Sequence, residues 1–233
     1  MLKYISNLYD WQIEKMEELG KGNDSLQIRY SAKIKSLANV TKNYKGKLQG
    51  FRRVGLTQKK YEDEKMLMEF IMAEPKLREQ YSAVIPRINT LYDEILKYAP
   101  RNLWYDHIYN VTPVFQTAGM IDNYRKAYKE LKTEEEKKAF KEKQLPRIKA
   151  SFYRLIALYD ETFEKSAMQK MFADAIQFNN VNEVKAVIAF YKGIKNTDEL
   201  SNKIDKLYAK SKVKDMKLIG KMIEAGDLEK LFK

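Results

Sequence analysis

Residues 146–163 read PRIKASFYRLIALYDETF, and apolar side chains recur in this stretch every three or four positions. The stripe comprises Ile148, Phe152, Leu155, Ile156, Tyr159 and Phe163. Because an α-helix has 3.6 residues per turn, this spacing predicts an amphipathic helix that buries one apolar face. Pro146 is compatible with the first turn of a helix, where its missing N–H costs no bond, so we expect the helix to begin there.

The same helical periodicity extends outward from this stretch over most of the chain, for example at Ile5, Leu8 and Met16 and again at Leu26, Tyr30 and Leu37. Only 9 Gly and 5 Pro occur, few for a chain rich in β-turns, and no stretch alternates as a strand does. The sequence therefore predicts an all-α fold of roughly eight to ten amphipathic helices without a sheet. We expect residues 1–233 to form a single helical domain.

Several helix boundaries are suggested by local motifs. Asp24 followed by Gln27 resembles a capping box, in which each side chain binds a free backbone N–H of the first turn. A helix from Ile88 is expected to end at Pro100, because proline cannot donate to the helical ladder. Residues 101–119 have the least regular pattern and predict short helices and a loop. The helix that carries Leu37 either continues through Asn39 to residue 50 or restarts there.

The sequence offers no complete catalytic or metal-binding motif. There is no cysteine, and His107 is the only histidine, so neither a thiolate metal site nor a pair of histidine ligands can be built. The chain also lacks a glycine-rich phosphate loop and a Gly-x-Ser-x-Gly motif. A packed or surface role for His107 is favoured over catalysis, because a triad also needs a placed nucleophile. We expect no cofactor, no metal and no activity from this chain alone.

The chain is strongly basic, with a formal net charge of +12. No acidic residue lies between Asp24 and Glu62, and aromatic residues, among them Tyr30 and Phe51, are interleaved with the cations of that stretch. Cations with aromatics can bind a nucleic acid, yet no nucleic-acid motif accompanies them. No apolar run reaches the roughly 20 residues of a membrane span, so a membrane partner is not expected. A basic helical module that binds nucleic acid or an acidic protein is the alternative hypothesis.

Residues 25–50 read SLQIRYSAKIKSLANVTKNYKGKLQG. This run resembles the bacterial chymotrypsin-like serine dipeptidyl-peptidases, the family of dipeptidyl aminopeptidase BII and dipeptidyl-peptidases 7 and 11. The matching positions are Arg29, Tyr30, Lys33, Asn39, Lys42, Gly46 and Gly50. Residues 152–176, FYRLIALYDETFEKSAMQKMFADAI, are similar to a later part of the same region, and the resemblance covers the rest of the chain more loosely.

The resemblance implies a function for the whole parent enzyme. In that family a helical domain is inserted into a double β-barrel that carries a Ser-His-Asp triad, and it caps the active-site cleft. The parent enzyme would remove dipeptides from peptide N-termini in the periplasm or cell envelope, and a homodimeric parent is compatible with the resemblance. This chain would be the inserted domain, with the catalytic double β-barrel and the N-terminus of the peptide substrate as its partners.

The resemblance also implies one site residue. In the family an Asn of the inserted domain helps to bind the free α-ammonium of the substrate, and Asn39 matches it. The competing interpretation is that Asn39 merely caps or interrupts a helix, as Asn often does. Gly46 and Gly50 are expected to be backbone or packing positions that let another helix approach closely.

Overall fold

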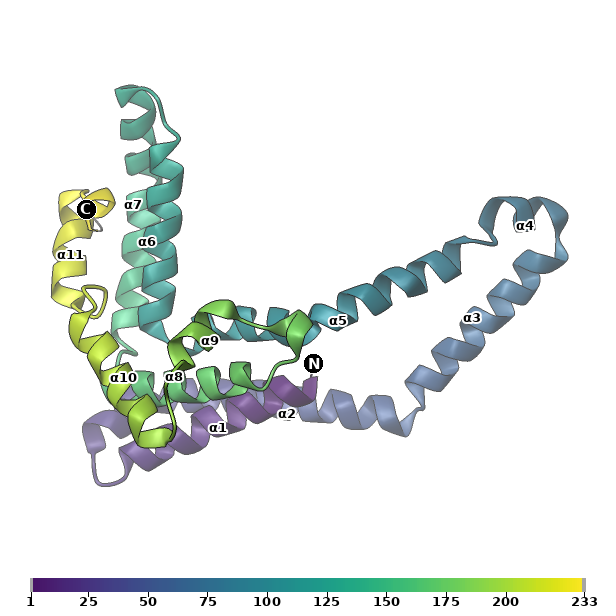
Figure 1. Cartoon of the computed structure of the whole chain (residues 1–233), viewed down its shortest axis with the longest axis horizontal. Helices are drawn as coiled ribbons and strands as arrows, with labels where there is room; N and C mark the ends of the chain where they lie inside the picture. The colour runs from purple at the N-terminus through teal and green to yellow at the C-terminus, as the bar shows by residue number, and fades with distance from the viewer. Residues whose placement is uncertain (1, 232–233) are drawn as a thin grey trace.

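The computed structural model describes residues 2–231, apart from the side chains of residues 109 and 110. Every regular element in that range is a helix, which confirms the all-α prediction (Figure 1). The α-helices are α1 Leu2–Gly20, α2 Asp24–Arg53, α3 Leu56–Ala73, α4 Pro75–Tyr81, α5 Val84–Val111, α6 Pro113–Lys129, α7 Glu134–Ile156, α8 Glu161–Ile176, α9 Lys185–Tyr191, α10 Thr197–Lys210 and α11 Met216–Ala225. Two 3₁₀-helices, η1 Asn180–Asn182 and η2 Leu228–Lys230, complete the order.

Helices α1 and α2 form a hairpin along one side of the body (Figure 1). The turn between them contains Gly22 at φ 71°, a left-handed conformation that glycine adopts without a steric penalty. The predicted capping box is wrong by one residue, because Asn23 is the N-cap and accepts from the Leu26 N–H at 3.1 Å. Gln27 instead donates to the carbonyl of Gly20 at 2.9 Å and ties the two helices together.

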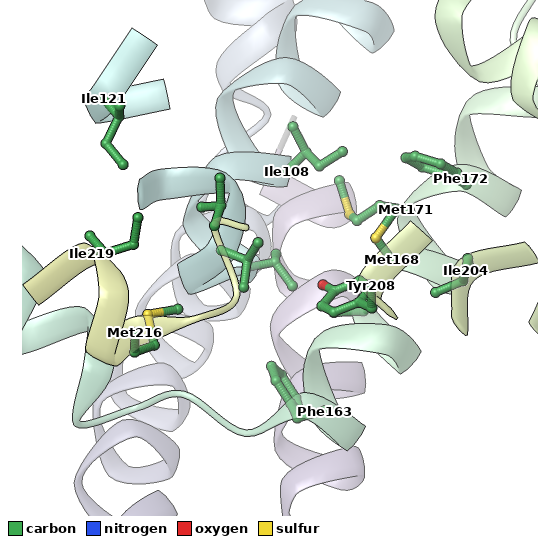
Figure 2. Packing of buried hydrophobic residues seen from close by; sticks show 14 of the residues in the cluster. Ile108, Ile121, Phe163, Met168, Met171, Phe172, Ile204, Tyr208, Met216 and Ile219 are labelled. Atoms are coloured by element: carbon green, nitrogen blue, oxygen red, sulfur yellow. The ribbon is translucent and has the colours of Figure 1, made fainter. Parts of the chain in front are cut away.

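Helix α8 lies at the centre of the body, against α1, α5, α9 and α10. Its residues Met168 and Met171 are at most 1% exposed and lie close to Ile204 and Tyr208 of α10 (Figure 2). Trp104 of α5 donates its indole N–H to the carbonyl of Met171 at 2.6 Å, so this buried polar group is satisfied. This core fixes the body from which the longer helices project.

The stripe at residues 146–163 belongs to two helices rather than one. Helix α7 begins at Glu134, where Thr133 is the N-cap and forms a capping box with Glu136, and the helix passes through Pro146. Pro146 is exposed, so water can satisfy the carbonyl that its ring leaves free. The helix ends at Ile156, and Asp160 caps α8 by accepting from the Phe163 N–H at 2.8 Å.

Pro100 does not end a helix, and residues 101–119 are not a loop. Helix α5 continues through Pro100 to Val111, and α6 begins two residues later at Pro113. The carboxamide of Asn182 enters the helical ladder beside the proline. Its Nδ2 donates to the Lys97 carbonyl at 2.7 Å, and its Oδ1 accepts from the Arg101 N–H at 3.2 Å. A side chain distant in sequence therefore supports the helix where proline disrupts it.

Helices α3 and α4 and the first half of α5 extend from the body as an arm (Figure 1). The apolar side chains of this arm are largely exposed, in contrast to the expectation that each amphipathic helix buries its apolar face. They include Tyr61, Met66, Leu67, Phe70, Val84, Ile88, Leu91, Tyr92, Ile95 and Leu96. Residues 56–101 carry eight basic and eight acidic residues, so the arm is neutral in a chain of net charge +12.

Helices α6 and α7 form a second projection, with α11 beside α7 (Figure 1). Helix α6 buries Thr117, Ile121 and Tyr124. Lys141 of α7 secures the C-terminal segment by pairing with Glu229 and by donating to the carbonyl of Gly226, each at 2.8 Å. Across residues 2–231 no helix is both long enough and apolar enough to cross a membrane.

Candidate functional site

Asn39 lies in the middle of α2, which runs without a break from Asp24 to Arg53. The interpretation that Asn39 caps or interrupts a helix is therefore wrong. The buried residues of α2 are Tyr30, Leu37 and Thr41, and at 100° per residue Asn39 points away from the side that they define. Its side chain is exposed and has no hydrogen-bond partner among the described residues. Asparagine at an exposed helical position costs roughly 0.7 kcal/mol relative to alanine, so the fold gives no reason for it here.

Gly46 and Gly50 lie on the same outward side of α2, two and three turns beyond Asn39. A Cβ atom added at either glycine would meet nothing within 4 Å. The expectation that they let another helix of the chain approach is thus wrong for the described residues. Each glycine costs about 1 kcal/mol in a helix interior, so this face of α2 holds three residues that weaken the helix. We call Asn39, Gly46 and Gly50 the outward face of α2.

The surroundings of the outward face are basic. Lys35 and Lys42 lie within one turn of Asn39, and both are exposed. Lys42 and Gly46 also line a groove of about 570 Å³ between α1 and α2, which Lys45 spans by pairing with Asp10 at 2.7 Å. A cation that binds at Asn39 therefore needs acidic groups from outside this chain to offset these lysines.

The inward face of α2 serves packing. Tyr30 is 2% exposed, and burial together with nearby Asp160 raises the pKa of its phenol. Burial lowers the pKa of the Lys33 ammonium. Arg29 donates to the Tyr159 carbonyl at 3.0 Å and holds α2 against the α7–α8 connection. Since Tyr30 is part of the core, it cannot stack on a base, which weakens the nucleic-acid alternative.

His107 is buried on α5, with its ring 5.9 Å from that of Tyr9 in an edge-to-face contact. Burial lowers the pKa of its imidazole and so favours the neutral ring. This placement agrees with a packed histidine. Within residues 2–231 no group of three His, Asp or Glu side chains is arranged to hold a metal ion.

Glu164 is a buried titratable residue that the sequence pattern does not reveal. It is fully buried on α8, where its Oε1 accepts from the Val114 N–H at 3.3 Å and its Oε2 accepts from the Tyr208 hydroxyl at 3.0 Å. Desolvation raises the pKa of this carboxyl to about 8. Glu164 sits within the core rather than in a cleft, and it joins the first turn of α6 to α10. We therefore assign it a structural role.

The described residues thus form an all-helical domain in which Asn39 is exposed on α2. The family model for peptidase S46 matches residues 3–232, nearly the whole chain. The chain therefore belongs to peptidase family S46, the family of dipeptidyl-peptidases 7 and 11. This result supports the resemblance seen at residues 25–50 and extends it over the entire helical region.

Proposed function

We propose that this chain is the helical domain that caps the active-site cleft of a serine dipeptidyl-peptidase, with Asn39 as a contact for the substrate α-ammonium. The exposed, unpartnered position of Asn39 carries this proposal. A carboxamide oxygen can accept a hydrogen bond from an ammonium without adding a charge. Fixing the amine relative to the scissile bond makes the enzyme release two residues rather than one or three.

The proposal assigns the chemistry to the parent polypeptide, whose double β-barrel would supply the Ser-His-Asp triad in the periplasm or cell envelope. Lys35 and Lys42, close to Asn39 on α2, repel an ammonium, so Asn39 does not suffice to bind it without a further group. A carboxylate from the catalytic body would offset that repulsion. Gly46 and Gly50 would let the backbone of that body, or of the substrate, come close to α2.

The exposed apolar side chains of the arm support a role for it as a large surface that binds a partner. Monomeric soluble proteins rarely expose apolar patches larger than about 300–600 Å². Ten large apolar side chains along the arm are at least 44% exposed. Because the arm is neutral, an apolar surface of the catalytic body can cover it without strong charge repulsion.

Replacing Asn39 with alanine in the parent enzyme should lower kcat/KM for a dipeptidyl substrate by about 10- to 100-fold. A hydrogen bond to a charged group contributes roughly 1.5–3 kcal/mol, which corresponds to this range. Asn43→Ala is the matched control, since Asn43 is an exposed asparagine one turn further along α2. Equal kcat/KM values for Asn39→Ala and the unmodified enzyme would contradict the role of Asn39.

The apolar arm gives a second prediction, for the chain alone. We expect it to bind the dye 8-anilinonaphthalene-1-sulfonate, with the fluorescence falling severalfold in a Leu91→Lys, Ile95→Glu double variant. Both side chains are more than half exposed, so stability should change little, and the net charge is unchanged. Ile28→Gln is the control, because Ile28 is an exposed apolar residue outside the arm. Unchanged fluorescence of the double variant would show that the arm is not the binding surface.

A further inference from the structure

The first half of α5 carries an exposed apolar stripe with the spacing of a coiled coil. Its residues are separated by four, three, four and three positions, which is the heptad repeat of a helix that packs along another helix. We call this stripe the α5 seam, and its residues, each between 39% and 59% exposed, are Val84, Ile88, Leu91, Ile95 and Tyr98. Helices α3 and α5 meet at α4 and are apart along the rest of the arm, so α3 does not cover the seam (Figure 1).

The charged positions beside the seam indicate which helix fits it. With Ile88 at position a and Leu91 at position d of the heptad, Arg87 and Glu94 occupy successive g positions. In an antiparallel pair of helices, position a packs against position d, and the g positions of the two helices face each other. When Ile88 of one copy packs against Leu91 of a second copy, Arg87 of each copy therefore lies opposite Glu94 of the other.

A parallel pair of α5 helices would form no such ion pairs. It would place each g position beside a following e position, so that Arg87 would face Tyr92 and Glu94 would face Ala99. Arg87 forms no ion pair with the described residues, and Glu94 is 64% exposed in its pair with Lys97 at 3.5 Å. Both side chains are thus available to a second copy, and they favour the antiparallel orientation.

The charge of the whole chain also favours an antiparallel pair. The arm is neutral, so the net charge of +12 lies outside residues 56–101. Antiparallel pairing in this register separates the Arg101 positions of the two copies by 23 helical residues, or about 35 Å along the helix axis. This separation exceeds several times the Debye length of about 8 Å at physiological ionic strength. The two basic bodies therefore repel each other weakly.

We propose that two copies of this chain dimerise through the α5 seam, with their α5 helices antiparallel and Arg87 of each copy paired with Glu94 of the other. A two-fold axis beside residues 89 and 90 relates the copies, so both present the same surface. The inference goes beyond the proposed function, which leaves the α5 seam unassigned. The catalytic body would contact the exposed apolar side chains of α3, among them Tyr61 and Phe70.

Sedimentation equilibrium of the chain over a range of concentrations tests the dimer. We expect a dissociation constant on the order of 10 µM, in the range of small interfaces. Arg87→Glu and Glu94→Arg each place like charges opposite one another at both pairs, so each should weaken the dimer about tenfold or more. A variant with both exchanges should dimerise like the unmodified chain. An equimolar mixture of the two single variants should form a heterodimer, because opposite charges then face each other again.

Two controls separate the seam from a general effect of charge or folding. Lys76→Glu changes the net charge by the same amount as Arg87→Glu, and Lys76 is exposed on α4 outside the seam, so this variant should dimerise normally. The Leu91→Lys, Ile95→Glu double variant should be monomeric. Circular dichroism should show equal helix content in all variants, since every substituted side chain is exposed.

Three outcomes would overturn the dimer. The first is a monomer at every concentration, which would leave the catalytic body as the cover of the seam. The second is a failure of the two single variants to associate when mixed, and the third is equal weakening by Lys76→Glu and Arg87→Glu. The role of Asn39 is measured separately, by kcat/KM of the parent enzyme, so the dimer and the proposed function fail independently.

Discussion

Replacing Asn182 with leucine should destabilise the body by about 2–3 kcal/mol and should loosen α5 at Pro100. The substitution removes three side-chain hydrogen bonds from a residue that is 2% exposed, two to α5 and one to the Asn179 carboxamide, and each such bond contributes about 1 kcal/mol. The effect should be local as well as global. Amide hydrogen exchange at Arg101 should accelerate at least tenfold, while urea unfolding reports the loss of stability.

A double-mutant cycle with Pro100 shows whether Asn182 acts through the proline. In a Pro100→Ala background the ladder regains a backbone donor, so the helix depends less on the Asn182 carboxamide. We therefore expect Asn182→Leu to lower the free energy of unfolding by at least 1 kcal/mol less in the Pro100→Ala background than in the unmodified chain. Equal costs in both backgrounds would show that Asn182 merely packs against α5.

The same contact explains where the sequence failed to predict the fold. Periodicity identified the helical class and most helices, because each helix shows a local 3.6-residue pattern. The helix boundaries predicted at Pro100 and Pro146 were wrong. The helix continues through Pro100 because a residue about 80 positions away supplies hydrogen bonds there, and through Pro146 because water can reach the exposed backbone. Neither form of rescue leaves a local signal in the sequence.

The candidate site was partly predictable. Resemblance suggested Asn39 as a candidate, and the helical period of α2 could have placed it opposite Tyr30 and Leu37. The expectation that Gly46 and Gly50 let another helix of the chain approach was wrong. A glycine in a helix does not reveal whether the group that approaches it belongs to the same chain or to another one. Glu164 was missed for a different reason: its burial depends on Val114 and Tyr208, 50 and 44 residues away.

Glu164 should make the chain lose stability as the pH rises from about 5 to 9. The pKa of its carboxyl is raised to about 8 from an ordinary value of 4.5, so the folded state binds the proton more tightly than the unfolded state. A group of this kind contributes stability that is fully present below pH 4.5 and lost as the pH rises through 8. Each pKa unit corresponds to about 1.4 kcal/mol, so the loss is on the order of 3–5 kcal/mol.

Glu164→Gln should remove this dependence while keeping the contacts. The glutamine oxygen can accept from the Val114 N–H, and its amide can donate to the Tyr208 oxygen. The variant should thus be more stable than the unmodified chain at pH 9 and similar to it at pH 5, as measured by urea unfolding at each pH. Glu161→Gln is the control. Glu161 is partly exposed, and the hydrogen bond from Lys165 lowers the pKa of its carboxyl, so the contribution of Glu161 to stability is constant above pH 5.

Comparing Glu164→Gln with the unmodified chain also tests why the buried carboxyl group of Glu164 is tolerated. Thr112 precedes α6 but donates its hydroxyl to the Ile108 carbonyl at 3.0 Å, so Glu164 acts as the cap of α6 in its place. A helix N-terminus favours a negative charge, whereas burial disfavours it, and the raised pKa indicates that burial is the larger effect. If the pH profiles of Glu164→Gln and the unmodified chain run parallel, the helix terminus and the Tyr208 hydroxyl compensate the buried charge fully.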